Sequence, residues 1–140
     1  MSFDVLERRM REKLEEVLVE KTTFHTNWNR LRQMLVEPML QSAEKVFTER
    51  RMRARAASRD EDVVLFVTGF DQRTHRLRFS ANSERLQIAC GYCCYVEGEA
   101  IPPGQEADVN FFALAEMSQL ALERTLIEFT EKVARDATAR

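Results

Sequence analysis

Three cysteines lie within five residues, in the segment CGYCC at 90–94, and their type and spacing come nearest to a chemical site. A C-x-x-C pair does redox chemistry where its first cysteine begins a helix, and thiolates bind zinc at about 2.3 Å. The residues around this segment alternate as they do in a β-strand. Residues four apart on a strand are separated by about 13 Å, so a straight strand cannot gather these thiolates around one metal ion.

The alternation instead predicts structural cysteines. Cys90 and Cys94 fall on the same strand face as Leu86 and Ile88, where a reduced cysteine behaves as a small buried hydrophobe. Cys93 falls on the opposite face and is the residue that a reactive or sensor thiol would use. We therefore expect no metal site and no cofactor.

Other catalytic patterns are missing from the sequence. His25 and His75 do not form a His-x-x-x-His pair, and a polar helix residue and a hydrogen-bonded strand residue explain them better than a general base. Four scattered glycines exclude a G-x-G-x-x-G or P-loop phosphate site, and there is no G-x-S-x-G segment. The sequence thus favours a protein without catalytic residues.

Arginines are concentrated in the segment RRMRARAASR, and the cluster comprises Arg50, Arg51, Arg53, Arg55 and Arg59. A solvated helix C-terminus explains the cluster, because cations there interact favourably with the helix dipole. The alternative is a nucleic-acid contact that also uses Arg73, Arg76 and Arg78. A pI of about 5.8 and the absence of aromatic residues between the arginines argue against nucleic acid.

Length and composition are those of an ordinary globular protein. With 140 residues, of which 44% are hydrophobic and 31% charged, the chain is long enough for one domain with its own core. No apolar run approaches the length of a membrane span, and the charged N-terminal segment does not resemble a secretory signal. An odd number of closely spaced cysteines indicates reduced thiols. We expect a cytoplasmic protein that does not contact membranes.

Residues 4–57 are predicted to form a helical arm. Apolar side chains recur in this segment with alternating spacings of four and three, the pattern of a helix that packs lengthwise on another helix. This interaction seam comprises Met10, Leu14, Val17, Phe24, Trp28, Leu31 and Leu35, with the polar Lys21 in the same register. Burying these side chains is worth on the order of 10 to 20 kcal/mol at most, so the seam must meet a partner surface.

The nature of that partner depends on the shape of the helix. A straight helix over the whole segment would extend for about 80 Å, far beyond a domain with a radius of gyration of about 14 Å. The segment 22–27 and Pro38 are the two places where it would bend. A bend at 22–27 would fold the seam into a hairpin, whereas a straight helix would pair with a second copy of the chain. The unbroken register of the seam favours the second copy.

The second half of the chain changes to a period of two and then returns to a helical pattern. Strands are expected at 62–70, 75–80 and 85–97, forming an antiparallel meander within 62–97. A loop over 98–107 follows, with a short fourth strand near 99–101 as an alternative, and then a helix over 108–136. The predicted fold is α+β, as one domain: a long N-terminal helix, a three-stranded antiparallel meander and a C-terminal helix packed on the sheet.

These features favour a homodimeric interaction, adaptor or chaperone-like protein without enzymatic activity. The reasons are the unpaired seam and a first strand, DVVLFVTGF, that is apolar on both faces. A different protein partner is the alternative to a second copy. Two other functions compete with this hypothesis: a nucleic-acid-binding module based on the arginine cluster, and a small enzyme or thiol sensor based on Cys93.

Overall fold

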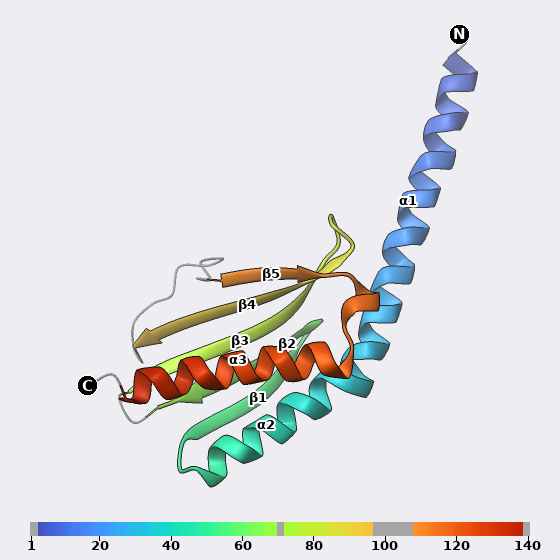
Figure 1. Cartoon of the computed structure of the whole chain (residues 1–140). Helices are drawn as coiled ribbons and strands as arrows, with labels where there is room; N and C mark the ends of the chain where they lie inside the picture. The colour runs from blue at the N-terminus through green and yellow to red at the C-terminus, as the bar shows by residue number, and fades with distance from the viewer. Residues whose placement is uncertain (1–2, 70–71, 97–107, 139–140) are drawn as a thin grey trace.

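The computed structural model describes residues 3–69, 72–96 and 108–138 of the chain. It is an α+β structure with a long N-terminal helix, an antiparallel sheet and a C-terminal helix (Figure 1). The helical elements are α1 (Phe3–Leu31), the π-helical turn η1 (Arg32–Val36), α2 (Glu37–Glu49), the 3-10 turn η2 (Leu114–Glu116) and α3 (Gln119–Thr138). The strands are β1 (Arg53–Arg59), β2 (Asp62–Thr68), β3 (Arg73–Asn82), β4 (Gln87–Val96) and β5 (Asp108–Phe112).

The sheet contains the expected antiparallel meander but has five strands instead of three, arranged in chain order. The predicted strands correspond to β2, β3 and β4, and the two additional strands lie at the edges. β1 replaces the last part of the helix predicted over 4–57, and β5 replaces the start of the helix predicted over 108–136. The expected loop over 98–107, with the alternative strand near 99–101, lies outside the described residues.

α2 ends at Glu49 because the chain adopts a helix stop there without glycine. Arg51 has a φ of 65°, in the left-handed region where glycine is normally found. The amide of Met52 donates to the carbonyl of Phe47 at 3.1 Å, and the amide of Arg51 donates to that of Thr48 at 3.0 Å, which is the Schellman arrangement. The prediction of a helix to residue 57 is wrong, because α2 ends at Glu49 and the chain continues as β1 from Arg53. No Gly or Pro marks this stop in the sequence.

β1 forms beyond this stop because arginine and alanine alternate there. Ala54 and Ala56 pack against the core, whereas Arg53 and Arg55 are exposed. The carboxylate of Glu44 on α2 accepts a hydrogen bond from the amide of Ala56 at 3.0 Å. α2 thus both covers β1 and satisfies one of its backbone donors, which stabilises an edge strand.

α3 begins at Gln119, so the helix predicted over 108–136 does not start at Asp108, although aspartate is a common N-cap residue. The hydroxyl of Ser118 accepts a hydrogen bond from the amide of Ala121 at 3.1 Å, which is how an N-cap serine satisfies a donor in the first turn. Residues 108–112 pair with β4 instead, and Phe112 lies opposite Ile88. The β-propensity of the valine and the two phenylalanines in VNFF outweighs the capping signal.

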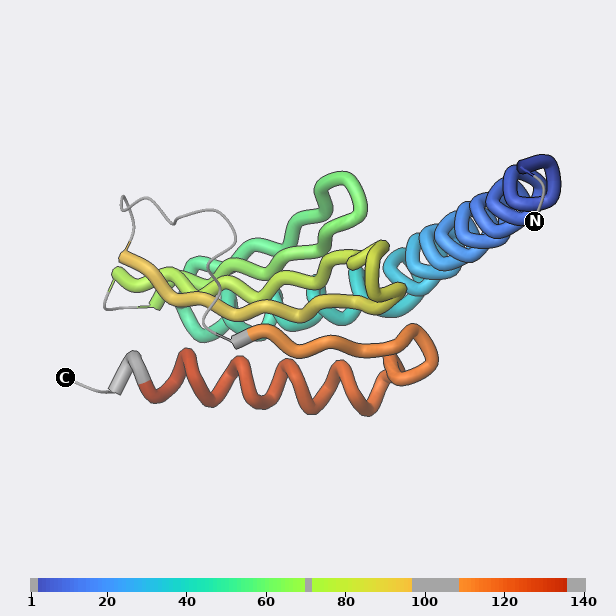
Figure 2. The backbone as a smooth tube through the Cα atoms, turned by 90° about the horizontal axis from the view of Figure 1, so that it is seen from above, coloured from blue at the N-terminus to red at the C-terminus, as the bar shows by residue number. Residues whose placement is uncertain are grey.

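The core lies between one face of the sheet and the helices α2 and α3. The strands contribute Val63, Leu65, Val67, Leu77, Phe79 and Ile88, which are all buried. The rings of Phe47 on α2 and Phe129 on α3 are 6.1 Å apart, so both helices share one core. Figure 2 shows α3 along this face of the sheet and no described helix along the opposite face.

α1 runs without a break through residues 22–27, so no hairpin forms there. The helical path changes at η1, where the amide of Glu37 donates to the carbonyl of Arg32, five residues earlier. The cause is Pro38, which has no amide hydrogen for the carbonyl of Met34 and whose ring would collide with it in a regular helix. Beyond this change α2 packs on the sheet, while the N-terminal part of α1 projects away from it (Figure 1).

Candidate interaction surfaces

The structure divides the predicted interaction seam into two halves. The C-terminal half packs against the core and comprises Phe24, Trp28, Leu31 and Leu35. In the N-terminal half, Met10 and Leu14 are 58% and 65% exposed, and Val17 is partly buried. Lys21 lies between the two halves. One half of the seam therefore meets the chain's own domain, and contact of the other half with a second copy stays a prediction.

Glu61, in the turn between β1 and β2, holds the buried half of α1. Its carboxylate lies 2.6 Å from Nδ1 of His25 and accepts a hydrogen bond from the side-chain amide of Asn29 at 3.2 Å. Its backbone carbonyl accepts a hydrogen bond from the indole nitrogen of Trp28 at 2.9 Å, so the buried tryptophan has its donor satisfied. These contacts give His25 a structural role in the helix.

A second polar network spans the bend at η1. Arg32 donates to the carboxylate of Glu37 at 2.7 Å and to the side-chain oxygen of Asn29 at 3.0 Å. The hydroxyl of Ser58 on β1 donates to the same oxygen of Glu37 at 2.8 Å. The bend and the β1–β2 hairpin are thereby joined, so α1 leaves the domain in a defined direction.

The projecting part of α1 carries an apolar stripe, which we call the arm stripe. It comprises Phe3, Leu6, Met10, Leu14, Val17 and Leu18, and all except Val17 are between 45% and 89% exposed. At 3.6 residues per turn these residues lie on one side of the helix, and Val19 lies on the other. The central residues line a shallow groove flanked by Glu7 and Arg11, which form an ion pair at 3.2 Å. Contiguous exposed apolar surface of this kind is typical of protein–protein and membrane contact sites.

Arginines from two strands gather on the sheet face opposite the core. We call this surface the arginine face, and it is defined by Arg53, Arg55 and Arg59 of β1 and Arg76 and Arg78 of β3. The strand register places Phe66 between Arg55 and Arg76, and places Thr68 and Thr74 between Arg53 and Tyr95. A groove of about 400 Å³ lies over this part of the face, lined by Arg53, Ala54, Arg55, Phe66, Thr68, Thr74 and Tyr95.

This face corrects two expectations about the predicted arginine cluster. The cluster is not one helix end, because Arg50 and Arg51 follow α2 whereas the remaining members belong to β1. The aromatic residues that the cluster lacks in sequence are supplied by Phe66 and Tyr95 from neighbouring strands. Arg73 is exposed at the start of β3, outside this face. The period of two in RARA is the signal that distinguishes this strand from the predicted helix, but the pairing partners are not visible in a single sequence.

The three cysteines differ in exposure. Cys90 is buried, as predicted, whereas Cys94, which the alternation placed on the same buried face, is exposed. The Cys94 sulfur lies 4.0 Å from Nε2 of the buried His75, whose Nδ1 is 2.8 Å from the hydroxyl of Tyr92. Cys93 is buried on the opposite face, which does not favour it as the reactive thiol. Its reactivity stays a prediction, and Cys94 is the thiol that solvent reaches.

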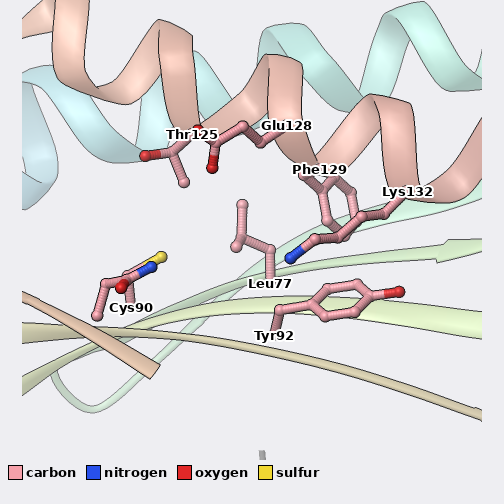
Figure 3. A pocket seen from close by; sticks show the side chains of 8 residues that line it. Leu77, Cys90, Tyr92, Thr125, Glu128, Phe129 and Lys132 are labelled. Carbon is pink, nitrogen blue, oxygen red and sulfur yellow. The ribbon is translucent and has the colours of Figure 1, made fainter. Parts of the chain in front are cut away.

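A small cavity lies between α3 and the sheet (Figure 3). Its volume is about 30 Å³, and its lining includes Cys90, Tyr92, Thr125, Glu128 and Lys132. The ammonium group of Lys132 lies 4.4 Å from the centre of the Tyr92 ring, a cation–π contact. The space is large enough for a water molecule but is far smaller than the roughly 300 to 1,000 Å³ of a typical ligand pocket. This cavity does not support the enzyme alternative.

Within residues 3–69, 72–96 and 108–138, no group of three or more His, Cys, Asp or Glu side chains is placed to hold a metal ion. None of the described helices combines the length and apolar character needed to span a membrane. No protein-family model, curated protein or solved structure matches the chain. The arm stripe and the arginine face are the candidate interaction surfaces among the described residues.

Proposed function

We propose that the protein is a non-enzymatic interaction protein that forms a homodimer through the arm stripe. The supporting observation is that large apolar side chains line one side of a helix that leaves its own domain. Burying one such side chain is worth about 1.5 to 3 kcal/mol as an upper estimate. Ten of them, five from each copy, give an upper estimate of about 15 to 30 kcal/mol, compared with the roughly 4 to 15 kcal/mol that association costs in lost freedom. A second copy supplies a surface of matching length and chemistry.

The charges beside the stripe favour an antiparallel arrangement of the two arms. Residues 8–13 carry four cations and one carboxylate, whereas residues 15–20 carry three carboxylates and no cation. An antiparallel pair centred near Leu14 brings the basic segment of each copy beside the acidic segment of the other. A parallel pair would bring like charges together, which is destabilising. In the antiparallel arrangement Met10 faces Leu18 of the other copy.

An antiparallel pair of arms carries the two sheet domains at opposite ends, as expected of an adaptor that holds two binding surfaces apart. The network around Glu61 and the one around Glu37 support this role, because they fix the direction in which each arm leaves its domain. An odd number of cysteines within five residues is no disulfide framework and supports a reducing compartment such as the cytoplasm.

Sedimentation velocity over low to high micromolar concentrations tests the dimer. The wild-type chain should dimerise, and Leu14→Glu should be monomeric because it places a charge in the middle of the stripe. Val19→Glu is the matched control: Val19 is 63% exposed on the same helix but lies about 140° around it from Leu14. A wild-type chain that remains monomeric, or a Val19→Glu variant that dissociates as completely as Leu14→Glu, would contradict the proposal.

Disulfide cross-linking tests the orientation of the arms, in a Cys94→Ser background that removes the exposed native thiol. Chains carrying Met10→Cys should cross-link to chains carrying Leu18→Cys when the two are mixed and oxidised. Each variant oxidised alone should give little product. Efficient cross-linking of each variant to itself would show parallel arms instead.

A further inference from the structure

We propose that the arginine face binds single-stranded nucleic acid, RNA or DNA, with phosphates on the guanidinium groups and a base stacked on Phe66. This inference goes beyond dimer formation and rests on a different surface, the open face of the sheet. The sequence argued against nucleic acid because the chain is acidic overall and its arginine cluster contains no aromatic residue. The strand pairing gathers the arginines on one face of the sheet and places aromatic residues among them.

The arginine face is locally basic. Of the described strand residues on this face, five are arginines and one, Asp62, is a carboxylate. The net charge of −2 for the whole chain therefore hides a basic surface on one side of the sheet. A concentrated patch of one sign attracts a ligand of the opposite sign even when the whole protein is nearly neutral. All the cations of the face are arginines, whose planar guanidinium groups bind phosphate oxygens in a bidentate manner.

The arginine face also contains aromatic residues, Phe66 and Tyr95. Phe66 on β2 is the direct cross-strand partner of Arg55 on β1 and of Arg76 on β3, so an arginine occupies the adjacent position on each neighbouring strand. The next row across this face of the sheet consists of Arg53, Thr68, Thr74 and Tyr95. The hydroxyls of Thr68 and Thr74 lie 3.0 Å apart in this row and add polar groups to the groove.

The combination of aromatic residues and arginines favours single-stranded nucleic acid over a duplex. An exposed sheet face that combines aromatic side chains with arginines is a recurrent surface for unpaired bases, which stack on the rings while the backbone contacts the cations. Bases in a duplex are stacked on each other and cannot reach a ring that is half-buried in a sheet. The groove of about 400 Å³ over Phe66 has a volume within the range of ligand sites.

Fluorescence anisotropy with labelled oligonucleotides of about 20 nucleotides tests the proposal. The probes are an oligouridylate, an oligothymidylate and a duplex of the same length. We expect both single strands to bind at about 50 mM salt, more tightly than the duplex, and to weaken steeply towards about 200 mM. Absence of single-strand binding at the lower salt concentration would overturn the proposal.

Two variants locate the site. Arg55→Gln with Arg76→Gln should weaken binding and reduce the slope of log K against log salt by about 0.7 for each phosphate contact removed. Phe66→Leu keeps an apolar side chain in the strand but removes the ring, and should weaken single-strand binding by about fivefold or more. The matched control is Lys45→Gln with Arg124→Gln, which removes two exposed charges from α2 and α3 on the other side of the sheet. Circular dichroism and urea unfolding establish that each variant is folded.

The outcomes separate nucleic-acid recognition from simple charge attraction. A control variant that binds as weakly as the Arg55 and Arg76 variant would overturn the site. Competition by polyglutamate as effective as competition by unlabelled oligouridylate, with Phe66→Leu unchanged, would show a site for acidic protein segments instead and would also overturn it. The monomeric Leu14→Glu variant should retain the affinity of each chain for the single strands. Failure of the dimer and failure of this proposal are therefore distinguishable.

Discussion

The two halves of α1 share one apolar pattern but have opposite environments. In the C-terminal half Trp28 is fully buried and its indole nitrogen is hydrogen-bonded to Glu61, 33 residues later in the chain. In the N-terminal half Leu14 occupies an equivalent position in the seam and is 65% exposed. The same spacing of apolar residues thus leads to a core in one half and to an open surface in the other.

Periodicity thus identifies the side of a helix that becomes buried but not the surface that buries it. The C-terminal half lies beside the β1–β2 hairpin, whose turn supplies Glu61. The N-terminal half extends beyond the sheet, and the described part of the chain offers it no surface (Figure 1). If a second copy covers this half, the apolar side of α1 is buried along both halves. The chain's own domain buries one half and the second copy buries the other.

The largest effect should separate the two halves by stability. Trp28→Ala leaves a cavity in the core and an unsatisfied carbonyl at Glu61, and should lower the free energy of unfolding by about 3 to 5 kcal/mol. Leu14→Ala should change it by no more than about 0.5 kcal/mol when measured by urea unfolding at a concentration where the chain is monomeric. Comparable losses for the two variants would break the distinction between the halves.

The anchor at Glu61 should give the next largest effect. Glu61→Ala removes the carboxylate that contacts His25 and Asn29 but keeps the backbone carbonyl that accepts from Trp28, so we expect a loss of about 1 kcal/mol. Hydrogen exchange should show the loss as faster exchange of amides in the C-terminal half of α1. Glu15→Ala, which removes an exposed carboxylate from the free half, is the control. An equal response to both substitutions would mean that Glu61 does not anchor the helix.

Lys21, at the boundary between the halves, provides a test by gain of function. Lys21→Leu continues the arm stripe into the buried half and should tighten the dimer by about threefold to tenfold in sedimentation equilibrium. Glu12→Leu adds a leucine to the opposite side of the same helix and should leave the dimer constant unchanged. An unchanged constant for Lys21→Leu as well would place the dimer contact elsewhere.

Asp62, the neighbour of Glu61, should give the smallest effect. Burial raises the pKa of Asp62 above its ordinary value of 3.8, the nearby Arg78 opposes the shift, and the carboxylates of Asp60 and Glu61 add to it. A raised pKa in the folded state means that ionised Asp62 disfavours folding, so stability is lost as the pH rises through that pKa. Asp62→Asn should therefore be more stable than the wild type at neutral pH.

The pH dependence of the stability difference between Asp62→Asn and the wild type tests this explanation. Urea unfolding of Asp62→Asn and the wild type should give equal stabilities at about pH 3, where the carboxyl is protonated in both folded and unfolded chains. The advantage of the variant should appear as the pH rises above 3.8. An advantage that is constant with pH would show that the asparagine acts through packing and not through charge.

Alternation along the strands was the most predictable feature of the fold. Val63, Leu65 and Val67 share the buried face of β2, and His75, Leu77 and Phe79 share that of β3, as the period of two predicts. The helix stop at Arg51 was not predictable in the same way, because a residue with a side chain occupies a position that glycine normally marks. The start of α3 was missed because Asp108 and Ser118 both resemble N-caps, and only the pairing of β5 with β4 decides between them.

The apolar side of each element follows from the amino-acid sequence alone, because it depends only on the backbone period and on the local order of side chains. The sequence also indicates that the chain is an α+β protein with a long N-terminal helix. The tertiary structure alone decided which half of the seam is covered, that Phe66 lies between Arg55 and Arg76, and that Cys94 is the exposed thiol. These features depend on contacts between residues far apart in the chain, and a local pattern carries no information about which distant segment will meet it.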